Sequence, residues 1–250
     1  MEKTVLVTGA SRGIGSEIAR RFALEGCRVA LNYHTSKKQA EELAAALEEC
    51  LGVSAGERIL PIHADVSDRK QVEQMFAQIQ GRFGDVDVLV NNAGIAQQKL
   101  FTDLTEDDWR RMFAVHVDGA FHCSQCALRG MIHRHRGKII NVSSMWGQIG
   151  GSCEVHYSAA KAALIGLTRA LAKEVGPSGI QVNCVAPGVI DTEMNCALSP
   201  ETLEQLCEET PLGVVGTCRD IAEAVFFLAD SRSDFITGQV LGVNGGMVIG

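Results

Sequence analysis

The chain has 250 residues, of which 46% are hydrophobic and 21% charged, and its formal net charge is −7. This length suits one large α/β domain or two small ones, and the hydrophobic share supports a core of ordinary size. The acidic balance argues against nucleic-acid binding, which needs clustered cations. The sequence contains no apolar run of about 18 residues, so we expect no membrane-spanning helix.

Short apolar runs alternate with amphipathic helical stretches along the whole chain. Strands are predicted at 4–8, 28–33, 58–64, 86–90, 138–142, 180–185 and 239–243, and helices at about 14–25, 37–51, 68–82, 106–132, 155–174 and 218–229. Continuous apolar strands are typical of parallel sheets buried on both faces. The alternation predicts an α/β fold of the Rossmann type, a doubly wound parallel sheet of about seven strands. No linker divides the chain, so we expect one domain, residues 1–250.

A glycine-rich turn, Thr8–Gly15, follows the first strand and opens the first helix. Glycines let backbone amides approach a pyrophosphate, and the helix N-terminus adds partial positive charge. The spacing is GxxxGxG rather than the commoner GxGxxG, but its strand–turn–helix setting predicts a dinucleotide site. The candidate contacts are Gly9, Ser11, Arg12, Gly13, Ile14 and Gly15.

The end of the second strand distinguishes the two nicotinamide cofactors. NAD-binding sites usually place an acid there, whereas this chain has Asn32 followed by Tyr33. A 2′-phosphate would meet no carboxylate, and Arg12 with Lys37 or Lys38 could pair with it. The predicted cofactor is therefore NADP(H).

Nine cysteines are scattered along the chain, an odd number that favours reduced thiols over a disulfide framework. One Cys-x-x-Cys pair, Cys123 and Cys126, falls within a helical pattern and has no second pair, so we expect two packed thiols and no metal site. The N-terminus enters an apolar strand without a signal-peptide pattern. We expect a cytoplasmic location.

Three residues predict carbonyl chemistry. Tyr157 and Lys161 are four positions apart in a predicted helix and so share one face. A nearby ammonium and a positive nicotinamide would lower the phenol pKa, ordinarily about 10, and allow proton exchange near neutral pH. Ser144, after the fifth strand, could bond the same carbonyl oxygen and stabilise the oxyanion that forms as hydride arrives. The alternative is that Tyr157 and Lys161 are ordinary surface residues of a helix without a catalytic role.

Together these motifs resemble the short-chain dehydrogenase/reductase family over essentially the whole chain. The matching elements are TGxxxGxG at 8–15, Asn91-Asn92-Ala93-Gly94, Ser144, Tyr157-x-x-x-Lys161 and Pro187-Gly188. The resemblance implies a homotetramer and further cofactor-site residues, namely Asp65, Val66, Asn91, Ala93, Gly94, Tyr157, Lys161, Pro187, Gly188, Ile190 and Thr192. Among these, Asn91 is implied to stabilise the end of the central strand.

One position departs from the family pattern. The family usually has an asparagine in the helix after the fourth strand, where it holds a water of the proton relay, and the aligned residue here is His116. A histidine can also bond water and can titrate near pH 6.5, roughly its ordinary pKa. His116 is therefore a fourth candidate catalytic residue, with a packed helix histidine as the alternative.

Several segments resemble the 3-oxoacyl-[acyl-carrier-protein] reductases within this family, namely 91–95, 170–176, 182–192 and 238–246. This resemblance implies a 3-oxoacyl thioester as substrate and acyl carrier protein as partner. An acidic carrier protein would need a cationic docking patch on this chain. The alternative is that the candidate cations only suit the negative end of a helix dipole. The candidates are Arg129, His133, Arg134, Arg136 and Lys138; a second docking cation usual before the sixth strand is replaced by Ser178.

The segment 145–156 lies between Ser144 and Tyr157 and is expected to line the substrate mouth. It resembles reductases of the 5-aminopentanone modification on elongation factor P, where an acid could pair with the substrate amine. The substrate candidates are Ser144, Trp146, Gln148, Glu154 and Met194, beneath a lid at about 188–215. Another small ketone, a sugar or a steroid stays open as substrate, as does a non-catalytic NADP-binding regulator.

Overall fold

The computed structural model describes residues 2–192 and 200–249, without the side chains of Pro200 and Leu203. Seven strands form one sheet in the order β3-β2-β1-β4-β5-β6-β7, and each neighbouring pair is parallel. They are β1 Thr4–Val7, β2 Arg28–Tyr33, β3 Ile59–His63, β4 Val88–Asn91, β5 Gly137–Val142, β6 Ile180–Pro187 and β7 Val240–Val243. The predicted doubly wound parallel sheet of about seven strands is confirmed.

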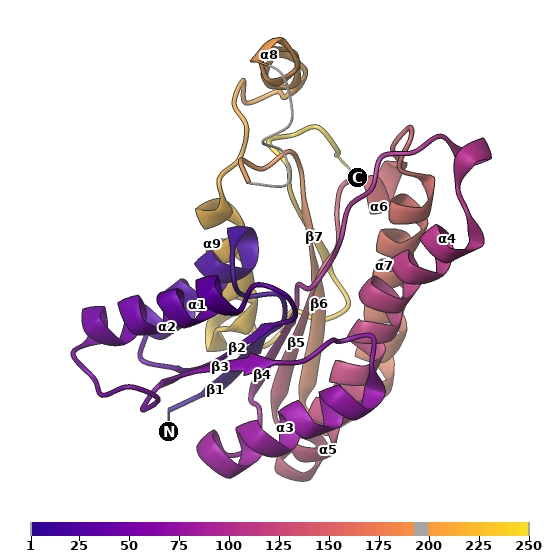
Figure 1. The fold of residues 1–250 in the computed structure, drawn as a ribbon. Coiled ribbons are helices and arrows are strands. Elements are labelled where there is room, and N and C mark those ends of the chain that lie inside the picture. Colours follow the sequence, from indigo (N-terminus) through magenta and orange to yellow (C-terminus); the bar gives the residue numbers. More distant parts are fainter. Residues whose placement is uncertain (1, 193–199, 250) are drawn as a thin grey trace.

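Helices cover both faces of the sheet (Figure 1). One face carries α1 (Gly13–Leu24), α2 (Lys37–Leu51) and α9 (Cys218–Ala229), and the other carries α3 (Arg69–Phe83), α5 (Gly119–Arg134) and α7 (Val155–Val175). The short helices α6 (Trp146–Ile149) and α8 (Pro200–Glu209) lie beyond the carboxyl ends of the strands. Within the described ranges, each helix is too short or too polar to cross a lipid bilayer.

The helix predicted at 106–132 contains a π-helical turn. It consists of α4 (Glu106–Phe113), a π-helical turn (Ala114–Asp118) and α5. The π turn holds His116, whose ring bonds the backbone of Ile95 in another segment. A side-chain period of 3.6 residues carries no sign of such a turn, because the contact that accompanies it is distant in sequence.

Side chains of β1 explain why the strands are apolar throughout. Val5 and Val7 pack beneath α1 and α9, whereas Leu6 packs on the opposite face with α3, α5 and α7. All three are fully buried. Successive side chains of a strand point to opposite faces, and burying one such residue stabilises the fold by roughly 1.5–3 kcal/mol. A two-sided sheet therefore needs apolar residues at consecutive positions.

The strand order reverses direction between β1 and β4, which places a crevice beyond their carboxyl ends. Two turns meet there. The Thr8 hydroxyl accepts hydrogen bonds from the backbone amides of Asn92 and Ala93, both at 2.9 Å, and the Asn92 side chain donates to the Thr8 carbonyl. These bonds hold the glycine turn beside the segment after β4 and so shape the floor of the crevice.

Candidate active site

A cleft of about 930 Å³ lies at this end of the sheet. Its lining includes every cofactor residue expected from the sequence except Asn91, Lys37 and Lys38, and it includes all four catalytic candidates. Asn91 lies beneath the cleft, where its amide donates to Ser124 and Asn141 at 3.1 and 2.8 Å. The side chain is turned into the sheet and ties β4 to β5 and α5, which agrees with the implied role of Asn91 at the strand end; the structure does not place this side chain in the cleft lining.

The glycine turn is shaped for close approach by a ligand backbone. Gly9 and Gly13 have φ values of +63° and +56°, in the left-handed region that favours glycine. A Cβ atom on Gly15 would lie 2.3 Å from the Gly9 carbonyl oxygen, so no side chain fits there. The turn leads directly into α1, whose N-terminal amides carry partial positive charge. The arrangement fits a bound pyrophosphate.

Asn32 lines the cleft but is only 2% exposed. Its Oδ1 accepts a hydrogen bond from the Gly9 amide at 3.2 Å, and its Nδ2 donates to the Ala64 carbonyl at 3.0 Å. The side chain thus fastens the glycine turn to the end of β3. Asn32 stands where NAD-binding sites usually have the ribose-binding acid. Its side-chain hydrogen bonds are made to the protein backbone rather than directed into the cleft.

The predicted role of Lys37 and Lys38 is wrong. Their ammonium groups face Glu41 and Glu42 at 3.7 Å on the outer surface of α2, outside the cleft lining. The cleft wall after β2 is instead formed by His34, Thr35 and Ser36, which were not predicted. These three residues directly follow β2. Ligands of parallel α/β sheets bind beyond the carboxyl ends of the strands, so the position of these residues in the sequence could have indicated them.

The three catalytic candidates meet at the other end of the cleft. Ser144 follows β5, while Tyr157 and Lys161 project from one face of α7, as predicted. The Lys161 ammonium donates to the Val142 carbonyl at 2.8 Å and lies 5.5 Å from the centre of the Tyr157 ring. The Ser144 hydroxyl accepts from the Trp146 amide at 3.2 Å. One serine, one phenol and one ammonium therefore converge on a single space.

Burial controls the protonation of this group. It raises the pKa of Tyr157 to about 12, and the Ser144 hydroxyl opposes that rise only in part. Burial also lowers the pKa of Lys161 to about 8. The net effect of the protein's own groups is therefore a raised Tyr157 pKa, and the lowering that the sequence predicts needs additional positive charge. A positive charge brought into the cleft, such as an oxidised nicotinamide ring, would act in that direction.

His116 is 2% exposed and lies edge-on to the Tyr157 ring, with 5.5 Å between ring centres. Its Nε2 lies 2.8 Å from the carbonyl oxygen and 3.1 Å from the amide of Ile95. Burial, together with the Lys161 charge, lowers the pKa of His116 to about 3. The ring is therefore neutral at neutral pH, which favours the packed helix histidine over the titrating relay residue. The His116 ring packs closely against Gly94: a Cβ atom on Gly94 would lie 2.5 Å from the Cε1 atom of His116.

The substrate mouth combines predicted and unpredicted residues. Trp146 and Glu154 line the cleft, whereas Gln148, two positions beyond Trp146 on the single turn of α6, faces solvent and does not. Met194 lies outside the described residues. Burial raises the pKa of Glu154, whose carboxylate accepts from Gln98 at 3.4 Å. Further lining comes from Gln97, Gln98, Arg111, Thr202 and Leu206, none of which carried a sequence motif.

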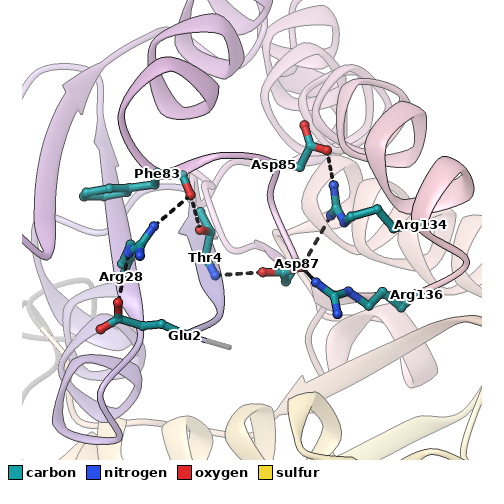
Figure 2. A pocket seen from close by; sticks show the side chains of 8 residues that line it. All are labelled: Glu2, Thr4, Arg28, Phe83, Asp85, Asp87, Arg134 and Arg136. Carbon is teal, nitrogen blue, oxygen red and sulfur yellow. Dashed lines mark hydrogen bonds and ion pairs between the residues drawn. The ribbon is translucent and has the colours of Figure 1, made fainter.

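Most of the predicted docking cations lie at the amino ends of the strands, far from the cleft within this chain. Figure 2 shows Arg134 paired with Asp85 and Asp87, and Arg136 facing Asp87 at 3.7 Å, around a pocket of about 280 Å³. Lys138 is buried and pairs with Asp234 at 2.7 Å; Arg129 and His133 are exposed. The predicted cationic patch is therefore corrected: three of its five members are engaged with acids.

The same pocket shows what these charges do. Arg28 donates to Glu2 at 3.0 Å and to the Phe83 carbonyl, and the Thr4 amide donates to Asp87 at 3.0 Å (Figure 2). The contacts join the first strand to the segment before β4. This group of ion pairs fastens the amino ends of the strands together.

Comparison with known proteins agrees with this geometry. A family model described as enoyl-(acyl carrier protein) reductase matches residues 9–248. The 3-oxoacyl-[acyl-carrier-protein] reductases FabG of Staphylococcus aureus (strain N315) and Haemophilus influenzae are 44% and 38% identical, each over 99% of this chain and 98% of their own. An uncharacterized oxidoreductase, YmfI, of Bacillus subtilis is 40% identical over 98% of this chain and 99% of its own. The chain is thus an oxidoreductase that acts on CH–OH and C=O groups, and it belongs to the short-chain dehydrogenase/reductase family.

Proposed function

We propose that the chain is an NADPH-dependent reductase of 3-oxoacyl thioesters carried on acyl carrier protein. The observation that carries this proposal is the convergence of Ser144, Tyr157 and Lys161 in the same cleft as the glycine turn. Two relatives of nearly equal length bear the name of this activity. The proposal includes a homotetramer, as the family resemblance implies, and a cytoplasmic location.

The cofactor assignment follows from the wall beyond β2. Arg12, His34, Thr35 and Ser36 line this part of the cleft, and no acid occupies the β2 end, where Asn32 stands. Cationic and hydroxyl side chains suit a phosphate, whereas NAD sites usually have a carboxylate at the strand end. This composition supports NADPH over NADH.

In the proposed reaction the nicotinamide supplies a hydride to the carbonyl carbon of the substrate. The hydroxyls of Ser144 and Tyr157 hold the carbonyl oxygen, and the Tyr157 hydroxyl gives it a proton as negative charge develops. The Lys161 ammonium, held at the Val142 carbonyl, adds positive charge next to the phenol and favours release of that proton. The product is a 3-hydroxyacyl thioester.

A lid over the substrate, at about 188–215, is part of the proposal. Thr202 and Leu206 of α8 line the cleft, which supports closure from this side. A covered site would exclude water and strengthen the electrostatic interactions that act on the carbonyl.

Glu154 favours a second candidate, a reductase of the 5-aminopentanone modification on elongation factor P. Its carboxylate is partly buried in the substrate mouth, where burial raises its pKa. It accepts a hydrogen bond from the amide of Gln98, which is neutral and does not balance the carboxylate charge. A substrate ammonium would offset the cost of burying this acid. A non-catalytic NADP-binding regulator is disfavoured, because the chain keeps Ser144, Tyr157 and Lys161 together in one cleft.

The test measures NADPH oxidation with acetoacetyl-[acyl carrier protein], acetoacetyl-CoA and elongation factor P that bears the aminopentanone. We expect the carrier-protein thioester to give the highest kcat/KM, and Tyr157→Phe to lower kcat by at least about 100-fold while NADPH binding is kept. A higher kcat/KM with elongation factor P would establish the second candidate. Tight NADPH binding without oxidation by any of these carbonyls would instead indicate the regulator.

A further inference from the structure

A cluster of four polar side chains lies behind the substrate wall, outside the catalytic group. The His156 cluster consists of Gln97, Lys99, Asp108 and His156. His156 directly precedes Tyr157 in the first turn of α7 and is 0% exposed. The carbonyl mechanism above uses none of these four side chains, although burying them carries a cost unless their hydrogen bonds are made.

The hydrogen bonds of this cluster have a defined direction. The Asp108 carboxylate can only accept, and it accepts from the Gln97 amide nitrogen at 2.9 Å and from the Lys99 ammonium at 2.7 Å. The Gln97 amide oxygen is then the group that faces the His156 ring, 3.0 Å from Nε2. Because this oxygen accepts, His156 must donate through Nε2–H.

Electrostatics agrees with this neutral tautomer. The carboxylate of Asp108 is held ionised, since the bonds from Lys99 and then Gln97 lower its pKa. Burial lowers the pKa of His156, and Lys99 acts in the same direction while Asp108 opposes both. The other ring nitrogen, Nδ1, is buried and has no hydrogen-bond partner among the described residues. A proton there would have nothing to bond.

The cluster also connects the segments that surround the substrate. Gln97 lines the cleft. Asp108 closes a capping box with Thr105 at the start of α4. The Lys99 amide donates to the Cys153 carbonyl at 2.8 Å, which joins the segment after β4 to the segment before α7. The bond between His156 and Gln97 is therefore a direct link between the helix that carries Tyr157 and the wall that faces it.

We propose that His156 is a positioning residue, whose Nε2–H bond to Gln97 fixes the substrate wall relative to Tyr157 and so orients the carbonyl for reduction. The turnover part of this inference rests on the proposed function. A role in packing alone would require the volume of the ring but not its donor. Glutamine can place a donor nitrogen where Nε2 stands, whereas leucine fills space without one.

The experiment compares His156→Leu, His156→Gln and Gln97→Leu in the full-length enzyme, with folding checked by circular dichroism. We expect His156→Leu to lower kcat/KM for the carbonyl substrate about tenfold, mainly through KM, with the NADPH dissociation constant within about twofold of wild type. His156→Gln should restore most of this loss. Gln97→Leu should lower kcat/KM at least as much as His156→Leu, because it also removes the bond to Asp108. The double variant should be no worse than Gln97→Leu alone, because the bond that His156 shares with Gln97 is then already lost.

Gln98→Leu is the matched control, because Gln98 also lines the cleft but bonds Glu154 rather than the cluster. Its effect should add to that of His156→Leu. Additive losses for His156→Leu and Gln97→Leu, a wild-type kcat/KM for His156→Leu, or a failure of His156→Gln to restore activity would each overturn the inference.

A second measurement does not depend on turnover. Nitrogen-15 spectra of the histidine rings, with the signals of His156 assigned from His156→Gln, should show protonation at Nε2 in the wild-type protein, and this pattern should change in Gln97→Leu. Protonation at Nδ1 in the wild type would contradict the proposed bond. If the wild type reduces none of the carbonyls, the proposed function fails, and these spectra still decide the inference about His156.

Discussion

At the scale of single residues, the surroundings of Tyr157 are dominated by burial. The phenol, the Lys161 ammonium and the His116 ring all have pKa values shifted toward their neutral forms. A dry, weakly charged site strengthens any charge that enters with the ligands, because fewer water dipoles screen it. The protein therefore prepares the site, and positive charge beyond that of the Lys161 ammonium is expected to come from the cofactor.

The neutral state of His116 has a measurable consequence for stability. Its pKa of about 3 in the folded chain lies below the ordinary histidine value of 6.5, so the unfolded chain binds the extra proton between these pH values. The contribution to stability is complete above pH 6.5 and is lost as the pH falls toward 3. We expect the free energy of unfolding of wild type to decline relative to His116→Asn by up to about 1.4 kcal/mol per pH unit in this range.

Urea unfolding of both proteins at several pH values between 7.5 and 5 measures this difference. Parallel pH profiles for the two proteins would show that His116 is not held neutral. If kcat of the wild type followed a group near pH 6.5 that His116→Asn lacks, the titrating relay would be supported instead.

The cofactor end allows a comparison of two histidines. His34 lines the cleft, with its side chain 57% exposed and its Nε2 3.7 Å from Asp65. The exposed His63 lies outside the lining, with its ring edge-on to Tyr33 and tilted against His34. We expect His34→Ala to raise KM for NADPH about three- to tenfold, because it removes one hydrogen bond to the 2′-phosphate. KM for NADH should stay unchanged, because NADH lacks this phosphate. His63→Ala should alter neither value by more than about twofold. Equal effects of His34→Ala on both cofactors would place its role outside phosphate recognition.

At the scale of elements, the contact between α6 and α7 sets the distance between Ser144 and Tyr157. A Cβ on Gly147 of α6 would lie 2.8 Å from the backbone carbon of Lys161 and 3.0 Å from the Ala162 amide. Gly147→Ala must therefore move α6 away from α7. We expect it to lower kcat at least about tenfold and to destabilise the fold by about 1–3 kcal/mol, measured by steady-state kinetics and urea unfolding.

Gly166→Ala on α7 is the control for this change. Nothing lies within 4 Å of the position of its Cβ, and Gly166 is exposed. Alanine should therefore stabilise the helix by about 0.5–1 kcal/mol and leave kcat unchanged. A wild-type kcat for Gly147→Ala would mean that α6 can shift without moving the catalytic group.

The success of sequence analysis also differs between elements. The strand Arg28–Tyr33 and the helix Lys37–Leu51 were predicted with their observed limits, because a continuous apolar run and a 3.6-residue period are local signals. The one-turn helix α6 and the π turn at His116 were missed, since tertiary contacts stabilise them. The same distinction holds in the site: the glycine turn after the first strand indicated the cofactor end of the cleft, but only packing shows that Asn32 bonds inward and that burial governs the Tyr157 pKa.

At the scale of the whole molecule, the two ends of the sheet have separate tasks. The carboxyl ends carry the cleft, and the amino ends carry the ion pairs of Arg28, Arg134 and Arg136 (Figure 2). Partly exposed pairs such as these contribute about 0–1 kcal/mol each, so their value lies in fixing strand ends rather than in binding. Under the proposed function, a chain with a net charge of −7 would attract an acidic carrier protein through cations near the cleft itself.

Arg111 of α4 is such a cation, because it is exposed and lines the cleft. Charges separated by more than about 8 Å are largely screened at physiological ionic strength, so position should matter more than net charge. Arg111→Glu is therefore expected to raise KM for acetoacetyl-[acyl carrier protein] about tenfold at low salt, to do so less at high salt, and to leave KM for ethyl acetoacetate unchanged. Arg136→Glu makes the same change in net charge at the opposite end and should leave both KM values near wild type. If the two variants raised KM for the carrier protein equally, overall charge rather than the cleft rim would govern docking.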